Sequence, residues 1–233
     1  MDKTSQMALP ISQGDKACFE NYWVGHNFEL ISALKNSIQR GDPKLIYFYG
    51  PTGAGKSHLM FATMRLAKEE IINTSYLSLA DMNVTPEVLE VVDVAHIVCV
   101  DNIDYWAGDE RLERSLFTLF EQVKHAGGQL FISAAQPPES CQFNLHDLVS
   151  RLSSGLVYPL YELNEEQQFE AIKMRANFRG LSISEEAVKY LISRSPRGTA
   201  ELFEILDHID RASLIEKRRI TIPFLQKLLS RDA

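Results

Sequence analysis

Residues 50–57 read GPTGAGKS and fill every required position of the phosphate-binding pattern G-x-x-x-x-G-K-[ST]. In such a loop, small residues let successive backbone N–H groups turn toward a polyphosphate, while Lys56 reaches the outer phosphates and the Ser57 hydroxyl binds Mg²⁺. An apolar run precedes the loop and a helical pattern follows it, so the helix dipole also favours an anion here. This context favours a nucleotide site over a chance glycine-rich turn. The residues expected to bind the nucleotide are Thr52, Gly53, Ala54, Gly55, Lys56, Ser57 and His58.

Composition bounds the class of protein. The 233 residues are 45% apolar, which is enough for the core of one large domain, or of one medium and one small domain. The net charge of −7 argues against broad non-specific binding to DNA or to anionic membranes. Three cysteines without paired or metal-type spacing suit a reducing compartment, and no segment reads as a signal peptide or a membrane span. We therefore expect a cytoplasmic protein without membrane partners.

Strand and helix patterns alternate along the first two-thirds of the chain. Alternation of this kind predicts βαβ crossovers and a five-stranded parallel sheet with flanking helices, an α/β fold. After residue 163 the patterns are helical only, which predicts a small all-helical domain. The expected strands are 45–49, 75–79, 97–101, 129–134 and 156–160, and the helices between them are 28–39, 56–71, 86–92, 111–126 and 145–152. The expected domains are a flexible tail over 1–17, an α/β domain over 18–162 and a helical domain over 163–233.

The strand 97–101 reads IVCVD and ends in a carboxylate. Beside a phosphate loop, Asp101 is expected to hold Mg²⁺ opposite Ser57 at the carboxyl edge of the sheet, which we favour over an unrelated terminal Asp. The next residue is Asn102, whose amide can position a water molecule but cannot take its proton. Whether Asp104 points at the site stays open. The prediction is nucleotide binding with slow intrinsic hydrolysis.

The strand 129–134 ends in polar residues. If it lies between the strands 45–49 and 97–101, its end adjoins the γ-phosphate, where Ser133 or Gln136 could sense that phosphate. An ordinary cluster of polar residues at a strand end explains the spacing equally well.

Arg151 lies near the end of the predicted helix 145–152. By itself, an arginine at a helix C-terminus is more often a partner of the helix dipole or of a salt bridge. Arginines that are presented to a neighbour's phosphates can also speed phosphoryl transfer by orders of magnitude.

Together these motifs resemble the AAA+ ATPases, a class of P-loop NTPases, and within them the DnaA-type replication initiators. The resemblance spans about residues 19–229 and implies an AAA+ nucleotide-binding domain followed by a helical lid, with ADP or ATP and Mg²⁺ as cofactors. Arg151 matches the arginine that family members present across a subunit interface. The stretches that carry the resemblance are GPTGAGKSHL (50–59), IVCVDNID (97–104), FISAAQPP (131–138), DLVSRLSSGL (147–156) and LFEILDHIDRAS (202–213).

Within this branch the sequence is most similar to DnaA-homologous regulators of the Hda type. A DnaA-type initiator carries a further helical DNA-binding domain after the lid, and because this sequence stops after the lid pattern we do not expect a duplex-binding initiator. The resemblance implies a DNA replication inhibitor in which Arg151 promotes ATP hydrolysis on DnaA. Asn102 departs from the family's hydrolytic carboxylate, and Ala200 from its lid arginine, for which Arg197 is the candidate substitute. Both departures lower the expected intrinsic ATPase activity.

The first residues supply a second link to replication. Residues 6–11 read QMALPI, similar to the sliding-clamp-binding peptide Q-L-x-L-P-L. A short extended peptide of this kind docks its apolar side chains in a pocket, its glutamine makes polar contacts, and proline lowers the cost of ordering. The alternative is a disordered tail with incidental apolar residues. The residues expected to bind the clamp are Gln6, Met7, Leu9, Pro10 and Ile11.

The expected partners are the DNA polymerase sliding clamp and the DnaA initiator, with DNA reached mainly through the clamp. Whether copies of the chain form a homo-oligomer stays open. The segment 19–27, which includes Tyr22 and Trp23, resembles the family's segment that borders the base, and packing of its aromatic residues on the core explains them equally well. The competing functions are a helicase-loader-like AAA+ adaptor and a self-contained ATPase.

Overall fold

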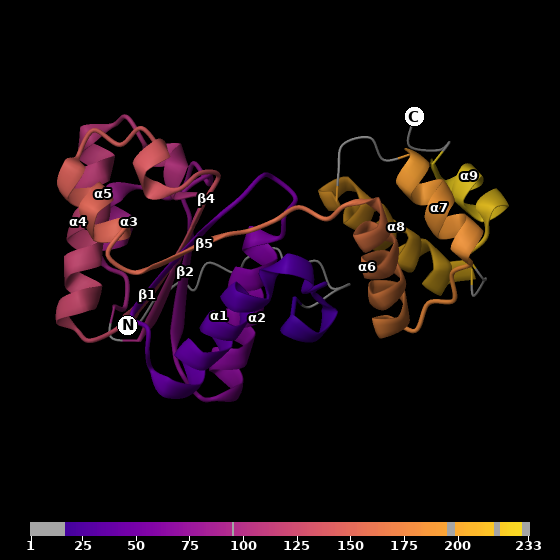
Figure 1. The fold of residues 1–233 in the computed structure, drawn as a ribbon, viewed down its shortest axis with the longest axis horizontal. Helices are drawn as coiled ribbons and strands as arrows, with labels where there is room; N and C mark the ends of the chain where they lie inside the picture. Colours follow the sequence, from indigo (N-terminus) through magenta and orange to yellow (C-terminus); the bar gives the residue numbers. More distant parts are fainter. Residues whose placement is uncertain (1–16, 95, 195–198, 217–219, 230–233) are drawn as a thin grey trace, which may run out of the picture.

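A five-stranded parallel sheet forms the centre of the larger part of the molecule (Figure 1). The computed structural model describes residues 17–94, 96–194, 199–216 and 220–229. The strand order is β2-β3-β4-β1-β5 and every neighbouring pair is parallel, which confirms the predicted sheet and places β4 between β1 and β3. The strands are β1 (Leu45–Tyr49), β2 (Thr74–Ser78), β3 (Ile97–Asp101), β4 (Gln129–Ala134) and β5 (Leu156–Pro159).

Helices cover both faces of the sheet, as Figure 1 shows. Successive residues of a strand point to opposite faces, so Phe48 packs in a core with α1 and α2, while Tyr47 packs in a second core with α3, α4 and α5. This two-sided burial explains why the strands read as continuous apolar runs. The helices are α1 (Phe28–Arg40), α2 (Lys56–Glu69), α3 (Pro86–Glu90), α4 (Glu110–His125) and α5 (His146–Leu152).

A smaller body made of helices follows the sheet and is joined to it by an extended segment after β5 (Figure 1). Its first helix begins with a reciprocal cap, because Asn164 Oδ1 accepts from Gln167 N at 2.9 Å and Gln167 Oε1 accepts from Asn164 N at 3.0 Å. An apolar core of its own includes Ile172, Leu191 and Leu225. The helices are α6 (Glu165–Phe178), α7 (Glu185–Arg194), α8 (Thr199–Glu216) and α9 (Ile222–Leu229). The exact domain limits stay a prediction.

Several predicted element ends were wrong by one or two residues. The strand predicted over 75–79 is β2, one residue earlier, because Thr74 pairs with Ile97 at the start of β3. The helix predicted over 56–71 ends at Glu69, since Ile71 adopts a left-handed φ of 61° that no helix continues through. In the parts of the chain that the structure describes, no helix is long and apolar enough to cross a membrane.

Candidate nucleotide-binding site

The loop 50–57 connects β1 to α2 at the carboxyl edge of the sheet. Gly55 has a φ of 98°, and a Cβ at this position would lie 2.7 Å from the Tyr22 ring, so both conformation and packing require glycine. Lys56 Nζ donates to the carbonyl oxygens of Gly50 at 2.6 Å and Pro51 at 3.0 Å. The ammonium group of Lys56, at the start of α2, therefore binds backbone carbonyl oxygens of its own loop.

Burial lowers the pKa of Lys56, while the carboxylates of Asp101 and Asp104 oppose that shift. A buried cation whose charged form is made less favourable gains from an anion brought next to it. The electrostatics of the loop thus suit a polyphosphate ligand.

Asp101 ends β3 and is almost completely buried. Its Oδ2 accepts from Ser57 Oγ at 2.6 Å and from Tyr76 OH at 2.9 Å, and its Oδ1 accepts from Ser133 Oγ. The structure therefore brings the two predicted metal ligands, Ser57 and Asp101, into direct contact. The role of Tyr76 was not predicted from the sequence, in which it is only a polar aromatic residue on the strand that pairs with β3. Burial, together with the Asp101 charge, raises the pKa of Tyr76.

The oxygens of Ser57 and Asp101 are of the kind that Mg²⁺ prefers. Among the residues that the structure describes, no group of three or more His, Cys, Asp or Glu side chains could hold a metal ion alone. Mg²⁺ is usually held by one or two protein oxygens together with substrate phosphates and water. The hydroxyl and carboxylate found here fit that pattern.

The other polar residues predicted to lie near the nucleotide are at the ends of β3 and β4. Ser133 is fully buried against Asp101, and its Oγ accepts from Asn102 N at 3.2 Å. Asn102 adopts a left-handed φ of 61° and lines the cavity at the loop. Asp104 Oδ1 accepts from Ala135 N at 3.1 Å, so this carboxylate is engaged at the end of β4. Asn102 thus lines the cavity, while its Oδ1 accepts from Ser78 Oγ at 3.4 Å at the end of β2.

A cavity of about 310 Å³ opens where the phosphate loop, the segment 17–27 and the helical body meet. Such a volume lies at the lower end of the range for small-molecule sites. The structure brings all seven predicted loop residues together on its wall. Arg197 and the predicted clamp-binding residues 6–11 lie outside the described residues. Residues from four parts of the chain line the cavity: the segment 17–27, the phosphate loop, the end of β3 and the helical body, including Trp23, Lys56, Asn102, Arg175, Thr199 and Phe203.

Tyr22 and Trp23 both line the cavity but differ in role. Tyr22 OH donates to Ala54 O at 3.1 Å and accepts from Asn27 Nδ2 at 3.1 Å, so Tyr22 braces the phosphate loop. Burial raises the pKa of the Tyr22 phenol and keeps it protonated. Trp23 lines the cavity, and its buried indole N–H has no hydrogen-bond partner within the described parts of the chain. A bound ligand would supply one.

Arg175 of α6 was not anticipated from the sequence. Its guanidinium reaches His58 on α2, with Nη2 2.6 Å from Nδ1, and lies over the Phe203 ring of α8. The helical body therefore contributes a buried cation to the cavity wall. The only sequence signal was an arginine on a helix between the apolar residues Ile172 and Ala176.

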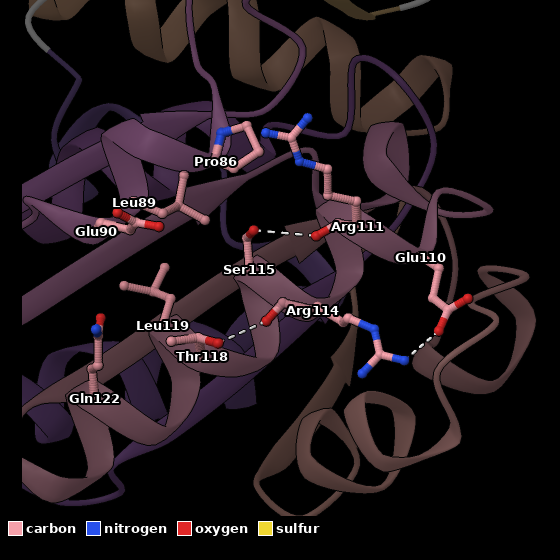
Figure 2. Close-up of a pocket in the computed structure, with 10 residues that line it drawn as sticks. All are labelled: Pro86, Leu89, Glu90, Glu110, Arg111, Arg114, Ser115, Thr118, Leu119 and Gln122. Carbon is pink, nitrogen blue, oxygen red and sulfur yellow. Dashed lines mark hydrogen bonds and ion pairs between the residues drawn. The ribbon is translucent and has the colours of Figure 1, made fainter.

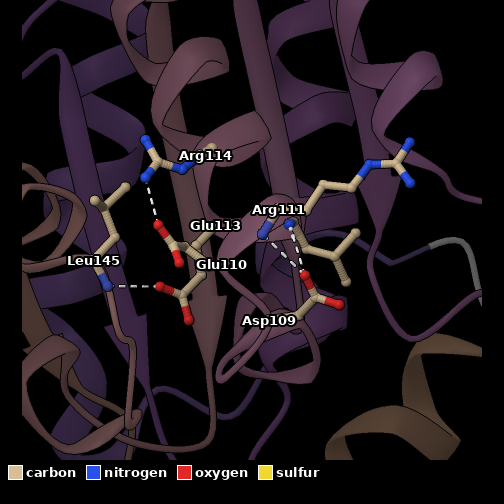
Figure 3. A network of polar contacts seen from close by, with 7 residues as sticks. Asp109, Glu110, Arg111, Glu113, Arg114 and Leu145 are labelled. Carbon is tan, nitrogen blue, oxygen red and sulfur yellow. Dashed lines mark hydrogen bonds and ion pairs between the residues drawn. The ribbon is translucent and has the colours of Figure 1, made fainter.

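Arg151 lies on α5, outside this cavity. Its side chain is 43% exposed, and its Nε lies 3.0 Å from Glu121 Oε1 on α4. The start of α5 is tied to α4 by the buried Glu113, which accepts from Asn144 N at 3.1 Å and from Leu145 N at 2.7 Å. Figure 3 shows the bond to Leu145. Arg151 is thus an exposed cation on a firmly anchored helix.

A larger cavity of about 580 Å³ lies between α3 and α4, and Figure 2 shows its lining residues. Exposed ion pairs flank it, with Arg111 3.0 Å from Glu87 and Arg114 paired with Glu110. None of the described site residues predicted from the sequence lines this cavity. Its mixed charges do not point to a particular ligand.

Comparison with known proteins places this site in a family. A family model described as "Bacterial DnaA ATPAse domain" matches residues 14–159, and one described as "Hda, lid domain" matches residues 165–229. The domain III structure of the Thermotoga maritima replication initiation protein DnaA matches with a TM-score of 0.74 and 20% identity, over 93% of this chain and 96% of that chain.

More distant matches agree on the fold. The replication initiator DnaA bound to AMPPCP and single-stranded DNA has a TM-score of 0.70 and 22% identity, over 93% of this chain and 68% of that chain. A variant of Thermotoga maritima RuvB has a TM-score of 0.65 and 18% identity, over 88% of this chain and 68% of that chain. These likenesses show the AAA+ fold with a helical lid. Since the DnaA family model spans more than half of the chain, this chain belongs to the family of the bacterial DnaA ATPase domain.

Proposed function

We propose that this protein is a nucleotide-gated regulator of replication initiation that promotes ATP hydrolysis on DnaA through Arg151. The observation that carries the proposal is the separation of two sites. The phosphate loop has an amide, Asn102, beside it, while the exposed cation Arg151 lies on another surface of the sheet domain. One site suits holding a nucleotide, and the other suits acting on the nucleotide of a partner.

The protein's own site binds ADP or ATP with Mg²⁺. The cavity at residues 52–58, the buried Lys56 and the Ser57–Asp101 contact support this, and two neighbouring DnaA structures contain AMPPCP. Ser133 senses the phosphates indirectly in this proposal, because it contacts Asp101. Asn102 cannot take a proton from an attacking water, so intrinsic hydrolysis is slow. The bound nucleotide therefore acts as a switch, and Arg197 is a further candidate contact from the lid.

Arg151 acts in trans as an arginine finger. A finger must reach a neighbour's phosphates from a rigid support, and α5 meets this need because Glu113 fixes its start. Residues 6–11 bring the protein to the sliding clamp, so that it meets DNA mainly through the clamp. In this proposal the protein works in the cytoplasm and associates with the nucleoid through its partners.

The test measures hydrolysis of DnaA-bound ATP in the presence of this protein and DNA-loaded clamp, with each omitted in turn. Arg151→Ala should lower the stimulation on the order of 10³-fold while ADP affinity of the variant stays at the wild-type level. Arg65→Ala is the matched control, because Arg65 is equally exposed and paired with Glu69 at 3.3 Å. Normal stimulation by Arg151→Ala would rule out the finger.

The same assay separates the competing functions. Rapid ATP turnover by the protein alone would identify a self-contained ATPase. Salt-sensitive binding to single-stranded DNA, without binding to the clamp, would favour a helicase-loader-like adaptor.

A further inference from the structure

Arg175 is a buried cation that α6 brings to the wall of the nucleotide cavity. Only 9% of its surface is exposed, and it lines the cavity together with the phosphate-loop residues. Arginine is rarely buried, because taking its charge out of water is costly. Its place at the meeting point of lid and phosphate loop therefore calls for an explanation.

Contacts with three described residues help to orient the guanidinium. Nε donates to Asn21 O at 3.3 Å, Nη2 lies 2.6 Å from His58 Nδ1, and the guanidinium carbon lies 3.8 Å from the centroid of the Phe203 ring. These groups come from the segment 17–27, from α2 and from α8. Arg175 is thus held where the two parts of the molecule face each other.

The hydrogen bonds of His58 show how the contact works. His58 Nε2 lies 3.0 Å from Cys18 O, and a carbonyl oxygen can only accept, so Nε2 carries the proton. Nδ1 then accepts from the Arg175 guanidinium. Because His58 directly follows Ser57, Arg175 is bound to the first turn of α2, whose backbone N–H groups face the phosphates in a loop of this type.

The geometry points to Arg175 as a phosphate-binding residue that the lid contributes to the nucleotide site. This inference rests on the proposed nucleotide site. A polyphosphate on residues 50–57 brings its anionic oxygens to the wall that the guanidinium helps to form, and the planar fork of arginine suits phosphate oxygens. Arg175 then supplies the lid cation that the sequence lacks at Ala200.

The charge of Arg175 also reaches the loop. Burial raises the pKa of Tyr22, and the positive charge of Arg175 opposes that rise at the hydroxyl that donates to Ala54. The hydrogen bond to His58 already joins α6 to α2, and a contact between Arg175 and the nucleotide would strengthen this connection, so that occupancy of the site stabilises the position of the lid.

The test compares affinities for Mg·ADP and adenosine in competition with a fluorescent nucleotide. Arg175→Gln should weaken Mg·ADP binding by about 10- to 100-fold, the effect of losing a hydrogen bond to a charged group, and leave adenosine binding unchanged. Arg175→Lys keeps the charge and should recover part of the loss. An unchanged ratio of the two affinities would overturn the inference, because a purely structural role weakens both ligands alike.

Two controls separate this inference from the proposed function. Lys173→Ala removes a cation of the same helix that pairs with Glu185 at 3.1 Å, outside the cavity, and should change neither affinity. Lys56→Ala tests the site itself: retained Mg·ADP binding would refute the proposed nucleotide site. Loss of binding in Lys56→Ala but not in Arg175→Gln would refute only the role of Arg175.

A measurement on the unaltered chain covers the case in which the variants fail to fold. Hydrogen exchange of residues 165–178 should slow on addition of Mg·ADP and stay unchanged with adenosine at saturating concentration. Equal protection by both ligands would overturn the assignment, because the phosphates would then not be needed to hold α6.

Discussion

At the residue scale, the site depends on two positions, Asp101 and Gly55, at which the structure requires one type of residue. Asp101 collects the hydroxyl groups of Ser57, Tyr76 and Ser133 on one buried carboxylate. Three donors compensate for burying its charge and fix its orientation. Gly55 meets a comparable demand in the backbone, because it combines a left-handed φ with close contact to Tyr22.

Gly55→Ala should lower both stability and Mg·ADP affinity. The left-handed φ alone costs a non-glycine residue about 1–2 kcal/mol, and the added Cβ also displaces the Tyr22 ring. Gly41→Ala is the matched control, since Gly41 has a φ of 73° with nothing within 4 Å of the added Cβ. Urea unfolding and ligand titration should show a larger loss of stability at Gly55 and a loss of affinity there only. Equal losses at both glycines would contradict the role of the Tyr22 contact.

At the element scale, the position of α5 is fixed by a contact from α4. Glu113 of α4 accepts from three backbone N–H groups, those of Gly108, Asn144 and Leu145. Figure 3 shows the bond to Leu145. A single buried side chain thus fixes the loop before α4 and the chain that leads into α5. The position of Arg151 depends on this anchor.

Glu113→Ala should destabilise the fold by about 3 kcal/mol or more, because three N–H groups lose their acceptor. Hydrogen exchange at residues 144–152 should accelerate, and stimulation of DnaA hydrolysis should fall while Mg·ADP binding remains. Glu110→Ala, which removes only an exposed pair with Arg114, should cost less than about 1 kcal/mol. Unchanged exchange of α5 in Glu113→Ala would show that the anchor is not needed.

At the scale of the whole molecule, the cavity joins parts that are far apart in sequence. Trp23, the phosphate loop and Phe203 of the lid line one space of about 310 Å³. A ligand in that space contacts the sheet domain and the lid together, so its binding energy stabilises their arrangement.

Mg·ADP at 100 times its Kd should therefore stabilise the protein by about 2.7 kcal/mol. For a chain of this size that gain raises Tm by roughly 5–10 °C. Differential scanning calorimetry measures the shift, which a metal chelator should reduce because Ser57 and Asp101 would lose their ion. Lys56→Ala should show no shift, and an equal shift in that variant would place the ligand elsewhere.

The sequence predicted those parts of the site that lie on one local motif. Ser57 and Asp101 were predictable because the phosphate loop and the end of a parallel strand meet at one edge of the sheet. Tyr76 depends on the register of β2 against β3, and Arg175 on how the lid packs on the segment 17–27, neither of which leaves a local pattern. The end of α2 was misplaced for a similar reason, since nothing marks Ile71 as left-handed.

The contact between Arg151 and Glu121 has a consequence for selectivity toward partners. To bind a partner, Arg151 has to leave the Glu121 carboxylate, which favours partners that offer more negative charge than one carboxylate. The pair with Glu121 is only weakly stabilising, because its two side chains are 43% and 40% exposed to water. A triphosphate carries several charges where a carboxylate carries one. In the proposed function, a nucleotide would therefore compete with Glu121 for Arg151 better than a single acidic side chain would.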